Sequence, residues 1–195
     1  MRRLRNTDSP TEQEAAILEA AAEEVALVGV GRASMDVIAR QAGVSRSTLY
    51  RRFPSRDALI TELGRQTFDY AVARLQTVGI DSGAKEAAVA AFCEGVRLLT
   101  GEPIMRRFLQ LDGNLTAMTG MFDEAEEFLC SAAAAMAKGL RAAGAAMPDS
   151  DLLAVSEMHI RLACSLAQVR TPVLDVRDDA AVRAYARKHL APLVW

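Results

Sequence analysis

Six arginines, several hydroxyl side chains and one tyrosine are concentrated between residues 32 and 56 of this 195-residue chain. The six arginines stand against a single acid, Asp36, so this stretch has a net charge of +5, whereas the whole chain has a formal net charge of −2. Guanidinium groups bind phosphates and base edges, and hydroxyl groups exchange hydrogen bonds with both. Phosphate binding needs such a local patch and not a basic protein overall. The pattern predicts a nucleic-acid-binding surface confined to one region.

The elements that must position these side chains are two short helices joined by a tight turn at Gly43. Glycine adopts the left-handed conformation that such a turn needs. Ser34 and Ser45 stand where the two helices should begin, each placed to offer a side-chain oxygen to free backbone N–H groups. The spacing therefore predicts a helix-turn-helix.

The outward face of the second helix follows from helical periodicity once Leu49 is placed inward. At about 100° per residue, Ser47 and Arg51 then lie on the opposite side, and Thr48 and Tyr50 lie on the flanks. A face that is small, hydroxylated and cationic suits the major groove of DNA. Arg51 is the first choice for a contact to a base edge.

The run IARQAGVSRSTLYRRFPSRDAL, residues 38–59, closely resembles the signature of the TetR family of bacterial transcriptional regulators. The AGVS turn, the TLY of the second helix and the F-P-S-basic-acidic-A-L opening of the next helix carry the resemblance. The chain departs at Ser47, where many members have glycine, and at Arg51 and Arg52, where histidine and an aromatic residue are frequent. These differences bear on which DNA sequence is recognised and leave the fold intact.

The resemblance implies that Thr48, Tyr50 and Arg56 hold the DNA backbone while outward positions of the second helix read bases. Ser34 is a further phosphate candidate. The predicted DNA-binding residues are Ser34, Arg46, Ser47, Thr48, Tyr50, Arg51, Arg52 and Arg56. The N-terminal arginines Arg2, Arg3 and Arg5 are either a mobile tail without consequence or an arm that approaches phosphates or the minor groove.

The composition and apolar spacing predict an all-α protein. Apolar residues make up 51% of the chain and their spacing is helical throughout, while β-branched and aromatic residues never alternate over a strand length. We expect an N-terminal arm and three-helix DNA-binding domain over residues 1–54. A connecting helix and a helical ligand-binding and dimerisation domain follow over 55–195, for about nine helices in total. Thr11 and Glu14 form a plausible capping box at the start of the first helix.

The helix expected over residues 151–169 carries apolar residues on two faces. One face can pack on its own domain, while the other, rich in alanine, lets a partner helix approach. The resemblance implies that the last two helices form a four-helix interface in a homodimer. Two copies reach successive major grooves about 34–36 Å apart and read an inverted repeat. The predicted interface residues are Leu153, Ile160, Ala163, Ala167, Val182 and Tyr185.

The resemblance also implies a cavity among the fifth to eighth helices. A small hydrophobic effector bound there would shift the fourth helix and release the DNA. Methionine and aromatic side chains adapt to apolar ligands, and a few polar groups orient them. The candidate effector-binding residues are Phe92, Arg97, Phe108, Met118, Met121, Phe122 and His159. Core packing explains the apolar members of this set just as well. For His159 the favoured interpretation is a hydrogen-bonded position in the core or at an interface.

Other classes of protein find less support in the sequence. No apolar run follows the basic N-terminus and no stretch approaches the length of a membrane span, so we expect a cytoplasmic protein without membrane contact. The chain has no glycine-rich phosphate loop, nucleophile elbow or paired metal-ligand motif, so neither an enzyme nor a metal or cofactor site is predicted. The expected function is a ligand-responsive regulator, by family resemblance a repressor.

Two alternatives remain open. A helical partner- or ligand-binding protein could retain the helix-turn-helix without contacting DNA, although the intact DNA-facing residues argue against it. A redox-responsive regulator could use Cys93, Cys130 or Cys164, each of which lies within an apolar helical pattern. Buried reduced thiols are the default interpretation, because nothing near them in sequence marks a depressed thiol pKa.

Overall fold

The computed structural model describes residues 9–109, 115–169 and 171–195, with side chains described outside 108–125. Within these ranges the chain forms nine α-helices, three short 3₁₀ helices and no strand, so the predicted all-α class is confirmed. None of the described helices is long and apolar enough to cross a membrane. The helices are α1 (Pro10–Val28), α2 (Met35–Gln41), α3 (Arg46–Arg52), α4 (Arg56–Thr77), α5 (Ala84–Gly101), α6 (Pro103–Leu109), α7 (Leu115–Ala142), α8 (Asp149–Gln168) and α9 (Asp179–His189).

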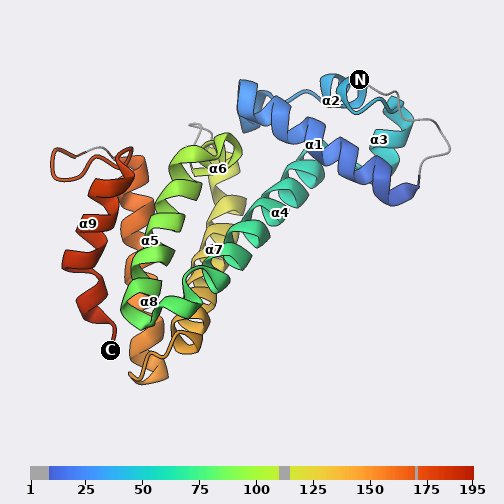
Figure 1. The fold of residues 1–195 in the computed structure, drawn as a ribbon. Helices are drawn as coiled ribbons and strands as arrows, with labels where there is room; N and C mark the ends of the chain where they lie inside the picture. Colours follow the sequence, from blue (N-terminus) through green and yellow to red (C-terminus); the bar gives the residue numbers. More distant parts are fainter. Residues whose placement is uncertain (1–8, 110–114, 170) are drawn as a thin grey trace.

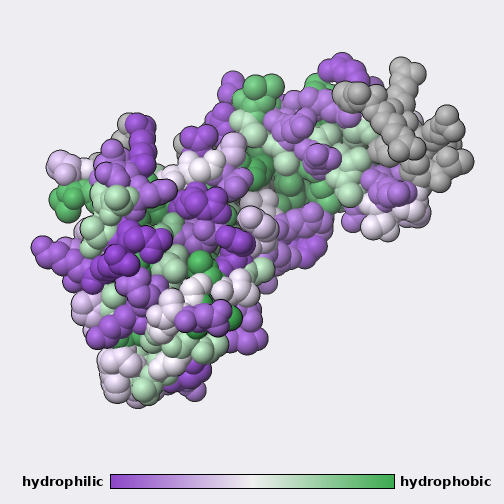
Figure 2. Space-filling view, in the orientation of Figure 1, coloured by the Kyte–Doolittle hydropathy of each residue, from purple (hydrophilic) through white to green (hydrophobic). Residues whose placement is uncertain are grey.

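The helices form two bundles, and α4 connects them (Figure 1). In the smaller bundle α1, α2 and α3 pack around Ile17 and Leu49, and in the larger one α5, α7, α8 and α9 pack around Phe92. The start of α4 contributes Leu59 to the first core and its end contributes Leu75 to the second. On the face shown in Figure 2, hydrophilic side chains cover much of both bundles and apolar side chains appear in patches between them.

The first helix begins earlier than the sequence predicted, and the capping residues differ. The Ser9 hydroxyl accepts a hydrogen bond from the Glu12 N–H at 3.2 Å, and the Glu12 carboxylate accepts one from the Ser9 N–H at 2.7 Å. Pro10 occupies the first turn, where its missing N–H costs nothing. The capping box predicted at Thr11 and Glu14 is therefore wrong by two residues.

Helices α4 and α7 cross in direct backbone contact. A β-carbon at Gly139 in α7 would lie 2.6 Å from the Gln76 carbonyl oxygen and 3.2 Å from its carbonyl carbon. No real side chain tolerates that distance, so glycine is what permits this approach. The crossing fixes the end of α4 against the larger bundle.

Helix α8 is divided between core and surface differently from the prediction. Ile160 and Ala163 are buried against the chain's own helices, as is Val182 in α9. Leu153 of the predicted interface is 44% exposed, so its place in that interface stays a prediction, and Val169 is 62% exposed. The predicted division of the faces is corrected: Ile160, Ala163 and Val182 belong to the core of the single chain and do not form an outward surface.

Candidate nucleic-acid interface and ligand cavity

The turn between α2 and α3 has the geometry that the sequence predicted. Gly43 adopts a left-handed conformation with φ +70°. The next residue, Val44, donates its N–H to the Ala39 carbonyl at 3.0 Å, which closes the turn. Ser45 then caps α3, because its hydroxyl accepts a hydrogen bond from the Thr48 N–H at 3.1 Å.

The start of α2 is held by a residue that the sequence did not reveal. Ser34 makes no side-chain cap. Instead its backbone N–H donates to the Glu24 carboxylate at 3.3 Å, and Glu24 is a buried residue of α1. The predicted cap by the Ser34 hydroxyl is therefore wrong, and the Glu24 carboxylate holds the start of α2 through the backbone N–H of Ser34. A phosphate contact by Ser34 stays a prediction.

The outward face of α3 carries four of the predicted residues. Leu49 is fully buried and anchors the helix in the smaller bundle. The exposed residues of the helix are Arg46, Ser47, Tyr50 and Arg51. This is the cationic and hydroxylated surface that helical periodicity predicted.

Thr48 lies closer to the core than its predicted place on the flank. It is only 6% exposed, and its hydroxyl lies 2.9 Å from the Ser45 hydroxyl oxygen. The Ser47 hydroxyl also lies 2.9 Å from that oxygen. Thr48 therefore takes part in the cap that starts α3, and its contact to the DNA backbone stays a prediction.

Two of the predicted arginines have partners within the chain. Arg46 pairs with Asp36 at 2.8 Å, and both side chains are more than half exposed. Such a surface pair is weak and is readily exchanged for a phosphate. Arg56 donates to the Gly31 carbonyl oxygen at 2.7 Å and so ties the start of α4 to the loop after α1. Arg52 is half-buried.

A contact from α6 to α1 links the two bundles. Arg107 donates to the carbonyl oxygens of Ala26 and Leu27 at 3.3 and 3.4 Å. These carbonyls lie in the last turn of α1, where orphan acceptors and the negative end of the helix dipole favour a cation. The sequence carried no signal for this contact, since the partners are about 80 positions apart.

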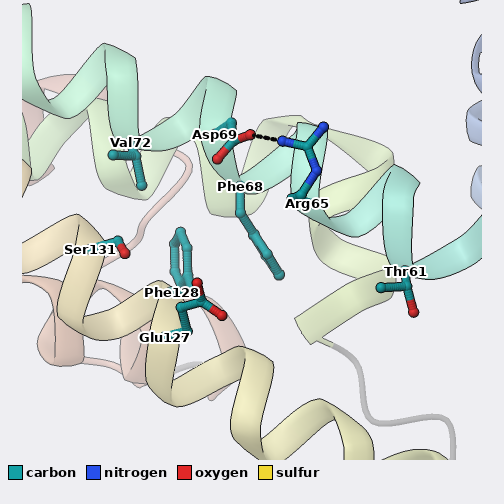
Figure 3. Close-up of a pocket in the computed structure, with 8 residues that line it drawn as sticks. All are labelled: Thr61, Arg65, Phe68, Asp69, Val72, Glu127, Phe128 and Ser131. Carbon is teal, nitrogen blue, oxygen red and sulfur yellow. Dashed lines mark hydrogen bonds and ion pairs between the residues drawn. The ribbon is translucent and has the colours of Figure 1, made fainter.

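A cavity of about 210 Å³ opens between α4 and α7 (Figure 3). The Phe68 and Phe128 rings point toward one another from the two helices, with centroids 4.6 Å apart. Arg65 on α4 lies at the cavity and pairs with Asp69 at 2.6 Å. The lining residues are Thr61, Arg65, Phe68, Asp69, Val72, Glu127, Phe128 and Ser131.

The candidate effector residues with described side chains lie elsewhere. Phe92 and His159 pack edge to face in the core with ring centroids 6.3 Å apart. The buried His159 ring bonds the Val155 carbonyl through Nδ1 at 2.7 Å, and burial lowers the pKa of His159, which favours the neutral ring. Neither these two nor Arg97 lines this cavity or a second one of about 20 Å³ in the core of the larger bundle. Four candidates lie outside the described side chains: Phe108, Met118, Met121 and Phe122.

An ion triad joins α4 to α5. Glu94, which is buried, accepts hydrogen bonds from Arg74 and Arg97, both at 2.9 Å through their Nε atoms. The Arg97 guanidinium, followed by that of Arg74, lowers the pKa of Glu94 to about 2. Arg97, a candidate effector-binding residue, is therefore held in an ion pair with Glu94 in this structure.

The cysteines give little support to a redox device. Burial raises the pKa of Cys93 and raises that of Cys164 to about 11, so both favour the thiol form. Cys130 is exposed on α7. In the part of the chain that is described, no three histidine, cysteine or acidic side chains are placed to hold a metal ion.

Residues 17–63 match the sequence model described as bacterial regulatory proteins, tetR family. The matched stretch contains α2, the Gly43 turn, α3 and the first two turns of α4. The chain therefore carries the N-terminal domain of the TetR family of bacterial regulatory proteins. The resemblance noted from the sequence is confirmed for this domain, and the TetR family binds DNA.

Similar proteins cover most of the chain and not the smaller bundle alone. An uncharacterised HTH-type transcriptional regulator of Mycobacterium bovis is 27% identical over 166 residues, covering 85% of this chain and 86% of its own. The crystal structure of a Mesorhizobium loti TetR-family regulator, classed there as putative, has a TM-score of 0.75 at 16% identity and covers 95% of this chain and 97% of its own. Salmonella enterica GusR has a TM-score of 0.74 at 18% identity, covering 97% and 99%. These two structures show that the fold is shared over nearly the whole length.

Proposed function

We propose that the protein is a ligand-responsive repressor that binds an inverted-repeat operator as a homodimer and releases it when a small molecule binds. The observation that carries the proposal is the outward face of α3, where Arg46, Ser47, Tyr50 and Arg51 are exposed while Leu49 anchors the helix. Side chains of these types can donate to base edges and phosphates in the major groove.

The outer face of α8 supports the homodimer. Leu153 and Met158 are 44% and 57% exposed, and Ala154 beside them is exposed as well. A partner copy would bury these apolar side chains, and the small Ala154 allows close approach of a second helix. Two copies related by a two-fold axis present two α3 helices about 34–36 Å apart, the spacing of successive major grooves.

The course of α4 supports coupling between a ligand and DNA. The cavity lies between the smaller bundle and the tight crossing of Gln76 with Gly139. At about 1.5 Å per residue, Phe68 lies about 12 Å from Gln76 along α4, and Arg56 lies about 30 Å from it. If α4 turns as a rigid rod about the crossing, a shift of about 1 Å at Phe68 becomes about 2.5 Å at Arg56. A ligand inserted beside Phe68 would therefore move the helix that carries the DNA-binding bundle.

The proposal is tested by titrating purified protein onto an inverted repeat found beside its own gene, with a scrambled duplex as control. We expect dimer binding that prefers the inverted repeat and weakens steeply with salt. A dimer with no measurable DNA affinity at low salt would contradict the proposal and favour a helical partner-binding protein.

A further inference from the structure

The cavity between α4 and α7 has an apolar, aromatic interior. Phe68, Val72 and Phe128 supply it, and the two rings meet at an interplanar angle of 32° (Figure 3). A cavity of about 150 Å³ is known to hold benzene, so the 210 Å³ here accommodates one ring with a few further heavy atoms. The body of a fitting ligand is therefore small and apolar.

The rim of this cavity is acidic despite the arginine that lies on it. Arg65 donates to Glu62 at 2.6 and 2.9 Å and to Asp69 at 2.6 Å, so two carboxylates neutralise one guanidinium. Glu127 adds another carboxylate, for which the described residues supply no cationic partner. The charged residues that line the cavity, Arg65, Asp69 and Glu127, have a formal net charge of −1, and Glu62 beside Arg65 brings the total to −2. This negative charge attracts a cation and repels an anion.

The combination of an acidic rim with two aromatic rings selects among ligand classes. An anionic ligand would meet an Arg65 whose charge Glu62 and Asp69 already neutralise, could use only the two N–H groups that these bonds leave over, and would still face Glu127. A neutral ligand gains only the apolar contact. A cation with an apolar body gains that contact, the attraction of Asp69 and Glu127, and contact of its charge with an aromatic face.

We infer that the cavity between α4 and α7, lined by Phe68 and Phe128, binds a small organic cation, an amine or quaternary ammonium with an aromatic or aliphatic body, with Glu127 as its counter-ion. The inference rests on the proposed ligand-responsive function and names the chemical class of the ligand. Asp69 acts beside Glu127, and because it also holds Arg65 it keeps that guanidinium away from the cation.

Calorimetric titration of the full chain with three benzyl compounds of similar size tests this inference. The probes are benzyltrimethylammonium, the neutral benzyl alcohol and the anionic phenylacetate. We expect the affinity for the cation to be at least about tenfold higher than that for phenylacetate. The affinity for the cation should fall as the salt concentration rises, whereas the affinity for benzyl alcohol should not depend on salt.

A matched pair of variants locates the counter-ion. Glu127→Gln should lower the affinity for the cation about threefold to fivefold, since the lost interaction is that of a partly exposed charge pair. The affinity for benzyl alcohol should not change. Glu126→Gln removes the same charge from the neighbouring exposed residue, which does not line the cavity, and should change neither affinity. The double variant Asp69→Asn with Glu127→Gln releases Arg65 from one carboxylate and should bring phenylacetate to at least the affinity of the cation.

Three results would overturn the inference: binding of none of the three probes, phenylacetate binding as tightly as the cation to the unmodified chain, or equal effects of Glu126→Gln and Glu127→Gln. Operator affinity measured on the same samples without a probe separates this from the proposed function. If the protein binds its operator but does not prefer the cation, only the inferred ligand class is refuted. If it prefers the cation but does not bind an operator, the proposed repressor function is contradicted and the cation site remains.

Discussion

The backbone of Gly139 in α7 lies against the carbonyl group of Gln76 in α4, with room for a hydrogen but not for a methyl group between them. Gly139→Ala should therefore destabilise the fold by about 1–2 kcal/mol, since overpacking against rigid backbone exceeds the gain in helix propensity. The free energy of unfolding from urea titration measures this change.

Gly95→Ala is the matched control for that substitution. The nearest atoms to a β-carbon at Gly95, in the interior of α5, are side-chain carbons 3.9 Å away. Here the propensity gain should prevail and raise stability by up to about 1 kcal/mol. Equal destabilisation by both substitutions would contradict the close crossing.

The carboxylate of Glu94 should make stability depend on pH. Its folded pKa is lowered from 4.5 to about 2, so its contribution is fully present above pH 4.5 and is lost as the pH falls toward 2. Glu94→Gln should cost about 1–2 kcal/mol at pH 7, because the two arginines are half exposed and solvent screens them, and should flatten the pH dependence below 4.5.

Unfolding free energies of the Glu94 variant between pH 2 and pH 7 measure this contribution. Glu157→Gln, which breaks an exposed pair with Arg161, serves as control and should change stability by less than about 0.5 kcal/mol. The same pH profile for unmodified protein and the Glu94 variant would show that the triad does not stabilise the fold.

Arg51→Ala should weaken operator binding by about 1–3 kcal/mol and relax the preference at one base pair, as expected for loss of a base contact. Arg177→Ala removes an exposed arginine from the segment before α9 and should leave operator affinity unchanged. Titration of a set of single-base operator variants measures both effects. Unchanged affinity and preference in Arg51→Ala would remove this residue from base recognition.

Arg56 should have two separable roles. Arg56→Ala loses the bond to the Gly31 carbonyl, which should cost about 0.5–1.5 kcal/mol of folding stability. It should also weaken binding to all DNA sequences alike and reduce the salt slope by about one. Arg56→Lys retains the charge, so its salt slope should match that of the unmodified protein. A salt slope unchanged in Arg56→Ala would assign Arg56 to the fold alone.

The DNA-binding helices were predictable from the sequence because their determinants are local. The Gly43 turn, the Ser45 cap and the inward Leu49 lie within seven consecutive residues and agree with one another. The start of α1 was misplaced for the same local reason, since Ser9 with Glu12 and Thr11 with Glu14 have the same spacing.

The faces of α8 and the cavity were not predictable, because both depend on which helices pack together. Helix α8 is apolar on more than one side, so only its contacts with α5 and α7 decide that Ile160 is buried and Leu153 exposed. Phe68 and Phe128 are ordinary apolar positions in sequence, and only the pairing of α4 with α7 brings their rings together. Tertiary packing between distant segments leaves no local signal.

The spacing of the two operator half-sites tests the central claim, paired recognition of DNA by two α3 helices, most directly. Affinity is measured for the natural inverted repeat and for one lengthened at its centre by about 5 base pairs, half a helical turn. Because the insertion turns one half-site to the opposite side of the duplex, we predict that binding falls to the level of scrambled DNA. Equal affinity for the two duplexes would contradict a homodimer that reads both half-sites together.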